Sequence, residues 1–284
     1  TNWGETVINY LNRTWNIKLP TFLFSHLNLS FLDVGMGLEP IKDNIPVVIY
    51  THGWAGEKIF ATDQLINIAS QGYLVVALDH TGLAMFTELP SGTIYNTGST
   101  EASTKVFNVM KEMSIDIQDT VTHLENLNYQ INLDDISIIG HSTGGGSAYL
   151  YCQTNNCSTL ILQDPFFVPI IEEFGSIELN TKSYFIYSQD WYQGYEDEES
   201  ISEIEVYREY TKNKDYAEGY YLTKSAHYDF VAFGAISELT SYTFLKGTIN
   251  YEDSLKTNNY FNLTALRNSE VIETEFLKLI KDSN

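Results

Sequence analysis

Basic residues are scarce in this sequence of 284 residues. Lys and Arg together number 16 against 37 Asp and Glu, so the formal net charge at pH 7 is −21. Nucleic acids and anionic lipid surfaces are themselves polyanions, and they repel a chain of this charge. The composition therefore argues against a nucleic-acid-binding protein.

Long apolar runs and cysteines are also in short supply. No run approaches the ~18 apolar residues that a membrane-spanning helix needs, so we expect no transmembrane segment. The only 2 cysteines, Cys152 and Cys157, are too few for a zinc site and lack the spacing of a redox motif. We therefore expect no metal centre.

The start of the chain and the cysteine spacing bear on the compartment. The chain opens on Thr1 rather than Met and shows no signal peptide, which is typical of a trimmed mature form. We therefore expect a secreted protein. In an oxidising compartment, Cys152 and Cys157 are close enough in sequence for the chain to fold back and join them in a disulfide. The alternative is a pair of buried free thiols.

Apolar side chains are plentiful, with 43% of the residues hydrophobic and 14% aromatic. That suffices for a large core, and we expect residues 1–284 to form a single α/β domain. Short apolar runs alternate with helical patterns, which predicts a mostly parallel, doubly wound sheet. The expected elements are strands over 46–50, 74–78, 135–139, 159–162, 183–187 and 219–222, helices over 59–70 and 106–124, an edge strand over 27–31 and a long loop over 80–100.

The most informative stretch is Gly140-His141-Ser142-Thr143-Gly144, where an apolar run ends in Gly-x-Ser-x-Gly and continues into helix-forming residues. This context is typical of a nucleophile elbow, in which a serine sits on a sharp turn between a strand and a helix. Gly140 and Gly144 fit because a Cβ at either position would clash with the neighbouring strand or helix. The alternative is a turn of small residues that packs a helix on a sheet. We expect Ser142 to be a nucleophile.

A serine hydroxyl needs a histidine to take its proton and a carboxylate to orient that histidine. In α/β-hydrolase folds these groups follow in the order serine, acid, histidine. Of the 6 histidines only His227 follows Ser142, so it is the expected base. Asp164 and Asp190 both follow expected strands between the two. The pattern alone leaves both open as the acid.

Acyl transfer also needs N–H donors for the oxyanion of its tetrahedral intermediate. The residue after the nucleophile supplies one, and the loop after the first buried strand supplies another. These positions are Thr143 and Trp54, the latter in the turn His52-Gly53-Trp54. We expect the His52 ring to brace this turn rather than to react.

Several of these segments together resemble the platelet-activating factor acetylhydrolase family of the plasma type, which has the α/β-hydrolase fold. They are Thr-His-Gly-Trp at 51–54, Gly-His-Ser-Thr-Gly-Gly at 140–145, Gln-Asp-Pro-Phe-Phe at 163–167 and Ala-His-Tyr-Asp-Phe at 226–230. The resemblance implies a calcium-independent serine esterase that removes short or oxidised acyl chains from phospholipids. It also implies the site residues, namely a triad of Ser142, Asp164 and His227 with oxyanion amides at Trp54 and Thr143.

The sequence departs from that family at the elbow. Thr143 stands where a bulky aromatic is common, and the pair Gly145-Gly146 follows. These features are also similar to bacterial cutinases and polyester hydrolases of the same superfamily. The two resemblances place the acid differently, because Asp164 matches the acetylhydrolase position and Asp190 matches the cutinase-like position.

We therefore expect a carboxylic-ester hydrolase that acts through an acyl-enzyme without metal or organic cofactor. Phe166 and Phe167 are expected to crowd a pocket suited to short acyl chains, and Trp191 with Tyr192 to form an apolar rim for a lipid or polymer. The first alternative is a cutinase-like polyester hydrolase or lipase. A more remote one is a non-catalytic hydrolase fold that serves as a binding protein.

Overall fold

The computed structural model of the protein describes residues 3–14, 16, 18–22, 35, 37, 44–96, 103–127, 129–189, 191, 209–212, 214–222, 225–231, 251–267 and 277–279. The edge strand expected over 27–31 lies outside the described residues, as do Asp190 and Tyr192.

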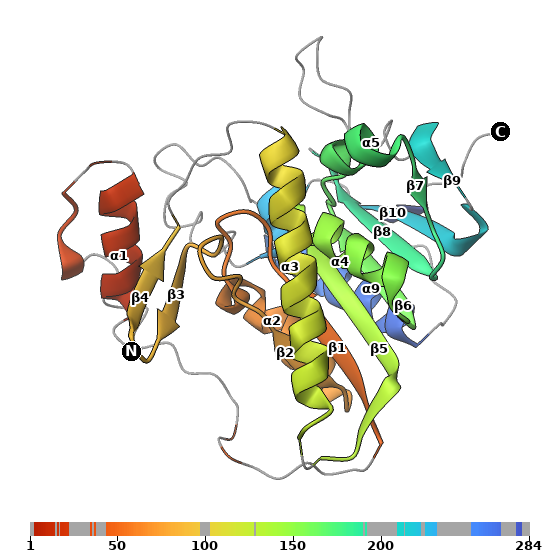
Figure 1. The fold of residues 1–284 in the computed structure, drawn as a ribbon, viewed down its shortest axis with the longest axis horizontal. Coiled ribbons are helices and arrows are strands. Elements are labelled where there is room, and N and C mark those ends of the chain that lie inside the picture. Colours follow the sequence, from red (N-terminus) through yellow and green to blue (C-terminus); the bar gives the residue numbers. More distant parts are fainter. Residues whose placement is uncertain are drawn as a thin grey trace.

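A seven-stranded sheet forms the centre of the described part (Figure 1). In chain order its strands are β1 (Ile45–Thr51), β2 (Leu74–Ala77), β5 (Ile131–His141), β6 (Thr159–Gln163), β8 (Ser183–Ser188), β10 (Ala217–Leu222) and β11 (Leu277–Leu279). Their order in space is β11-β10-β8-β6-β5-β1-β2. All neighbours are parallel except β10 and β11. The predicted mostly parallel sheet is confirmed.

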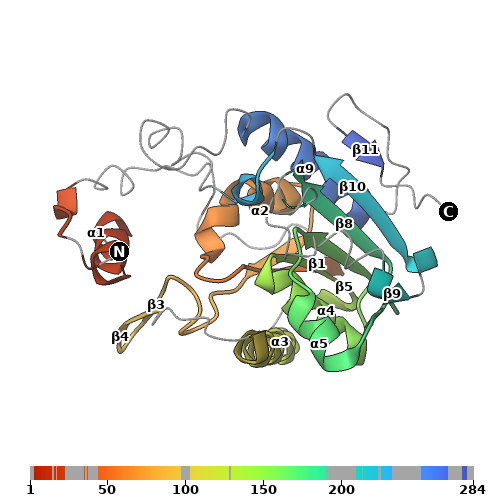
Figure 2. The ribbon, with the colours of Figure 1, turned by 90° about the horizontal axis from the view of Figure 1, so that it is seen from above.

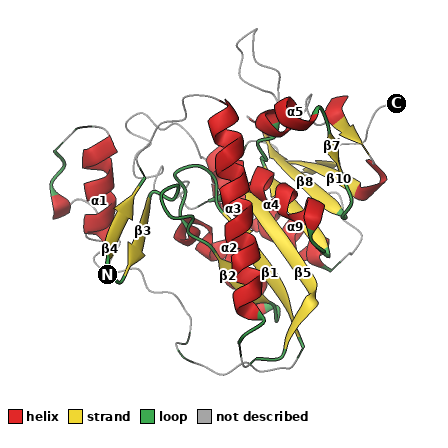
Figure 3. Cartoon of the chain, in the orientation of Figure 1, coloured by secondary structure: helices red, strands yellow, loops and turns green. Residues whose placement is uncertain are grey.

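Helices cover both faces of this sheet (Figure 3). They are α2 (Thr62–Ser70), α3 (Ser103–Leu124), α4 (Thr143–Thr154), α5 (Val168–Phe174) and α9 (Tyr251–Leu266). Figure 2 shows α2 and α9 on one side and α3, α4 and α5 on the other. Alternate residues of β1 face the two layers, because Val47 and Ile49 join the cluster with α3 and α4 whereas Val48 and Tyr50 join the one with α2 and α9. This is the expected α/β-hydrolase architecture.

Shorter elements surround the sheet. They are α1 (Trp3–Thr14), the hairpin of β3 (Phe86–Leu89) and β4 (Gly92–Tyr95), the pair β7 (Ile177–Glu178) and β9 (Thr211–Lys212), and the 3₁₀ turns η2 (Lys58–Ala61), η3 (Lys214–Tyr216) and η4 (His227–Phe230). Val7 and Tyr10 of α1 pack in a small apolar cluster with Met85 and Phe86 beside this hairpin. No helix among the described residues is long and apolar enough to cross a membrane.

Two expectations about the elements were wrong. The stretch over 80–100, predicted as a loop, contains the β3–β4 hairpin, whose register is Phe86 opposite Tyr95 and Leu89 opposite Gly92. Its strands are short and largely exposed, so the residue pattern carried no alternation to detect. The strand at 74–78 was expected to be buried, but β2 is half-buried because it is the last strand of the described sheet.

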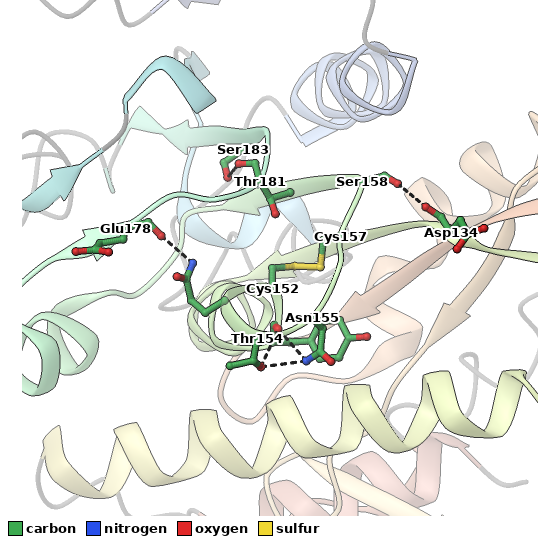
Figure 4. The surroundings of a disulfide bond; sticks show 11 residues. Asp134, Cys152, Thr154, Asn155, Cys157, Ser158, Glu178, Thr181 and Ser183 are labelled. Carbon is green, nitrogen blue, oxygen red and sulfur yellow. Dashed lines mark hydrogen bonds between the residues drawn. A yellow bond between two sulfur atoms is a disulfide. The ribbon is translucent and has the colours of Figure 1, made fainter.

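The two cysteines form the disulfide, and not the alternative pair of buried free thiols. Cys152, near the end of α4, is bonded to Cys157 in the turn that leads into β6 (Figure 4). Both sulfur-bearing residues are buried in the larger core cluster. The Ser158 hydroxyl then donates to the Asp134 carbonyl on the elbow strand β5. The disulfide and this hydrogen bond therefore tie the end of α4 to the sheet.

Candidate active site

Ser142 occupies the sharp turn between β5 and α4 that the glycine pattern predicts. Its backbone angles, φ 55° and ψ −123°, are rare for a residue with a side chain. Hydrogen bonds hold this conformation, because the Ser142 N–H donates to the Gln163 carbonyl at 2.9 Å and the Ser142 carbonyl accepts from the Phe166 N–H at 3.0 Å. The end of β6 thus fixes the elbow.

Close backbone packing explains the glycines around Ser142. A Cβ on Gly140 would lie 2.5 Å from the Gly144 carbonyl oxygen, and one on Gly144 would lie 2.3 Å from the Thr51 carbonyl oxygen. A Cβ on Gly53 would meet the Ser142 Cβ at 2.8 Å. The turn after β1 is therefore pressed directly against the elbow serine, as a loop carrying an oxyanion donor must be.

Asp164 and His227 are brought together from two different strand ends. Their contact is 3.1 Å, between His227 Nδ1 and Asp164 Oδ2. The Asp164 side chain is 0% exposed and that of His227 is 16% exposed, so the carboxylate is hidden behind the ring. Asp164 follows β6 with φ 41°, a turn that aims its side chain away from the strand. Of the two candidate acids, the one within the described residues contacts the histidine.

Ser188, which no motif indicated, holds the Asp164 carboxylate from β8. Its N–H donates to Asp164 Oδ1 at 2.7 Å, and its hydroxyl donates to Oδ2 at 2.5 Å. A buried carboxylate needs such donors because burial without them is very unfavourable. The only available signal was positional, since Ser188 ends the strand that lies next to β6 in the parallel sheet.

The His227 ring packs against two other rings. Trp191 stacks on it at a centroid distance of 4.1 Å and an angle of 16°, and the His141 ring lies 4.5 Å away at 33°. His141 Nε2 is 3.0 Å from the His227 carbonyl oxygen and so donates a proton to it. Since His141 directly precedes Ser142, these contacts place His227 beside the elbow.

Burial sets the protonation of this pair of rings. It lowers the pKa of His227 to about 3, and burial together with the charge that His227 would carry lowers the pKa of His141 to about 3. The Asp164 carboxylate opposes this effect because it favours a protonated neighbour. His227 is therefore neutral near pH 7 and can accept a proton, with Nδ1–H directed to Asp164.

No hydrogen bond joins the Ser142 hydroxyl to His227 among the described residues. Such bonds commonly tighten only when substrate binds. The two backbone donors expected at the site, the N–H groups of Trp54 and Thr143, make no backbone hydrogen bond within the described part of the chain. Thr143 begins α4 and so has no acceptor within its own helix.

Three aromatic residues were expected at the substrate pocket, and they occupy different environments. Trp191 covers His227 and donates from its indole to the Pro165 carbonyl at 3.3 Å. Phe166 is half-buried next to the elbow. Phe167 has no exposed surface and packs against Tyr149 and Phe185, so the expectation that it crowds a pocket was wrong. It became a core residue because the chain turns into α5 directly after it.

The arrangement as a whole contains the groups that acyl transfer requires. A half-buried serine on a strained turn, a neutral histidine, a buried acid and two N–H groups without backbone acceptors among the described residues gather at the carboxyl ends of β1, β5, β6 and β10. The described residues contain no group of three or more His, Cys, Asp or Glu that could hold a metal ion.

Comparisons with known proteins show the family and the fold. The family model for platelet-activating factor acetylhydrolase, isoform II, matches residues 98–283, which is more than half of the chain. Among solved structures, the ferulic acid esterase from Streptomyces cinnamoneus is similar with a TM-score of 0.70 and 18% identity, covering 86% of this chain and 76% of that one. At that identity the likeness supports the fold alone. No curated protein matches the sequence.

Proposed function

As a member of the platelet-activating factor acetylhydrolase family, the chain is a carboxylic-ester hydrolase, and we propose that it acts through an acyl-enzyme on Ser142. The observation that carries this mechanism is the 3.1 Å contact between His227 Nδ1 and the buried Asp164 carboxylate beside the elbow. That contact supports the tautomer in which His227 Nε2 is free to accept a proton.

The proposed reaction has two halves. Ser142 Oγ attacks the ester carbonyl carbon while its proton passes to His227 Nε2, and the N–H groups of Trp54 and Thr143 stabilise the resulting oxyanion. His227 then gives the proton to the departing alcohol oxygen as the C–O bond breaks, which leaves the acyl group on Ser142. Water attacks this ester in the same way, releasing the carboxylic acid and restoring the hydroxyl.

For the substrate we propose esters with short or oxidised acyl chains of the phospholipid type. The family supports this choice, and so does the Trp191 ring stacked on His227, which places an apolar surface beside the base. An activity series of p-nitrophenyl esters from acetyl to dodecanoyl tests it, and so does a pair of phosphatidylcholines with an acetyl or a palmitoyl chain at the second position. Activity that rises steadily with chain length, or release from polyester film at a matching rate, favours the cutinase-like alternative.

Labelling by a fluorophosphonate probe tests the mechanism itself. We expect one covalent adduct on Ser142 in the folded protein and none in Ser142→Ala. A folded wild-type protein that stays unlabelled and hydrolyses no ester would contradict the acyl-enzyme mechanism.

We also propose that the protein works in an oxidising, extracytoplasmic compartment. The bond between Cys152 and Cys157 supports this, because disulfides persist in such compartments and are rare in reducing ones. Fractionation of the source cells with immunodetection is the test, and a protein found wholly in the cytosol contradicts the proposal.

A further inference from the structure

A hydrogen-bonded group behind the Trp54 turn has no part in the reaction described above. It consists of Thr51 and His52 from the end of β1, His80 after β2, and Asp116 on α3, and we call it the turn clamp. His52 and His80 are 1% and 2% exposed, so their ring nitrogens depend on protein partners. The contacts of these nitrogens show what the clamp holds.

The His52 ring has a defined tautomer. Its Nε2 accepts the backbone N–H of His80 at 3.1 Å, and only an unprotonated nitrogen can accept. The ring proton is therefore on Nδ1, which donates to the Gly53 carbonyl oxygen at 2.7 Å. Burial and the neighbouring His80 lower the pKa of His52 to about 3, so the ring keeps this neutral form.

The carbonyl held by His52 belongs to the peptide that carries the Trp54 N–H. In a planar trans peptide the C=O and the following N–H point in opposite directions. The Gly53 oxygen is held from one side by His52 Nδ1–H and by the Gly56 N–H at 3.0 Å. The Trp54 N–H must then point away from the side on which His52 and Gly56 lie. Gly53 itself packs directly against the elbow, because a Cβ on Gly53 would touch the Ser142 Cβ.

His80 ties the same turn to the elbow helix. Its Nδ1 is 2.7 Å from Asp116 Oδ2 and its Nε2 is 2.7 Å from Thr51 Oγ1. Thr51 Oγ1 is in turn 3.2 Å from Ser147 Oγ on α4, and the Ser147 hydroxyl donates to the Gly144 carbonyl at 2.8 Å. The turn and the elbow thus share one continuous set of hydrogen bonds.

We propose that His52, held in place by His80, is the positioning residue that aims the Trp54 N–H at the oxyanion. The inference rests on the proposed function, because it assigns a task only if Ser142 and Trp54 act as proposed. Aiming a donor at an oxyanion stabilises the transition state and not the bound ester. Loss of the clamp therefore lowers kcat and leaves KM unchanged.

Two substitutions separate the two bonds of the His52 ring. In His52→Asn the side-chain amide nitrogen takes the place of Nδ1 and can still donate to the Gly53 carbonyl. In His52→Gln the amide reaches the place of Nε2, so the bond to His80 N–H is kept and the bond to Gly53 is lost. The matched control is His123→Gln, since His123 is exposed on α3 away from the clamp.

We measure kcat and KM with p-nitrophenyl acetate and the inhibition constant of a trifluoromethyl ketone, which forms a tetrahedral oxyanion adduct. For His52→Gln we expect kcat and inhibitor affinity to fall together by about 10- to 100-fold at unchanged KM. For His52→Asn we expect both to stay within about 5-fold of wild type, as a kept donor predicts. His123→Gln should match wild type.

Equal losses in the two His52 variants overturn the inference, and so does a change confined to KM. If His52→Gln fails to fold by circular dichroism, Thr51→Val replaces it, because valine keeps the shape but removes the hydroxyl that fixes His80. Wild-type kcat and inhibitor affinity in Thr51→Val also overturn the inference. These results would not contradict the proposed function as long as the wild-type enzyme is active and labelled on Ser142. An inactive, unlabelled wild type would contradict the proposed function itself.

Discussion

At the scale of single residues, Asp164 combines burial with charge. Its carboxylate is fully buried yet accepts hydrogen bonds from Ser188 at both oxygens and from His227 at one. A carboxylate that is satisfied in this way can stay ionised inside the protein and orient a neighbouring imidazole. Its role as the acid is a prediction that mutation can test.

We predict that Asp164→Asn lowers kcat by roughly 10⁴, because an amide in this position favours the wrong tautomer of His227. Asp190→Asn is the matched variant at the cutinase-like position, and it should retain activity. Turnover of p-nitrophenyl acetate is the measurement, with circular dichroism to confirm folding. The reverse result would move the acid to Asp190 and favour the polyester-hydrolase interpretation.

Ser188 provides a second prediction at this scale. Ser188→Ala removes the hydroxyl donor from Asp164 Oδ2, the oxygen that also contacts His227. The carboxylate then becomes more basic and favours a protonated ring, so the pKa of His227 rises. We expect the acid limb of the kcat/KM profile to move to higher pH, with kcat reduced by about 10-fold, the effect of losing a hydrogen bond to a charged group.

The control for Ser188 lies on the same strand. Ser183→Ala removes a buried hydroxyl from the opposite end of β8, where it bonds to the Thr181 carbonyl, and should leave the pH profile unchanged. Ser188→Thr keeps a hydroxyl and should restore the position of the acid limb. An acid limb that does not move in Ser188→Ala contradicts the proposed role of this serine.

Residues tied to a motif were predictable, and residues defined only by tertiary contact were not. Ser142 followed from the glycine pattern and His227 from chain order, whereas Asp164 needed a family resemblance to separate it from Asp190. Ser188 and His80 lie in no motif. Ser188 is 24 residues from its partner Asp164, and His80 is 36 residues from its partner Asp116. No local sequence pattern therefore marks either residue.

At the scale of elements, continuous apolar runs predicted the buried strands well. β1, β5, β6 and β8 lie in the middle of the described sheet and are sandwiched by helices, which requires apolar residues on both faces. The β3–β4 hairpin escaped prediction because its strands have only four residues each and only Phe86 and Thr87 are buried, so they need no such pattern. The sequence therefore predicted the deeply buried strands and missed the more exposed ones.

The disulfide gives a prediction about the end of the elbow helix. Replacing both Cys152 and Cys157 by Ser should lower the free energy of unfolding by about 2 kcal/mol, the chain-entropy estimate for so short a loop. The bond lies at the opposite end of α4 from Ser142, so kcat should stay unchanged. Urea unfolding followed by circular dichroism measures the first quantity, and ester turnover the second.

The thiol state itself is checked by intact mass after alkylation. Without reductant the wild-type protein should take up no alkylating agent, and with reductant it should take up two equivalents. Full alkylation without reductant contradicts the bond, and the stability difference would then have another origin.

At the scale of the whole molecule, buried titratable groups link stability to pH. His52, His141 and His227 each have a pKa lowered from 6.5 to about 3 by burial. Unfolded, they take up protons near pH 6.5, so the stability they contribute is present above that pH and is lost as the pH falls toward 3. Glu57 acts in the opposite sense, because burial raises its pKa from 4.5 to about 7 and unfolding releases its proton between those values.

Between pH 6 and pH 5, uptake by three histidines and release by Glu57 leave a net uptake of about two protons on unfolding. The free energy of unfolding should therefore fall by about 3 kcal/mol for each pH unit of acidification. The Phe86 N–H donates to Glu57 at 2.8 Å, and the amide oxygen of Glu57→Gln can still accept this bond. The amide cannot titrate, so the free energy of unfolding of Glu57→Gln should fall more steeply, by about 4 kcal/mol for each pH unit of acidification. Urea titrations at closely spaced pH values measure both slopes, with His123→Gln expected to match wild type. A stability that is flat or rises on acidification, or equal slopes for wild type and Glu57→Gln, would show that these groups do not set the pH dependence of the fold.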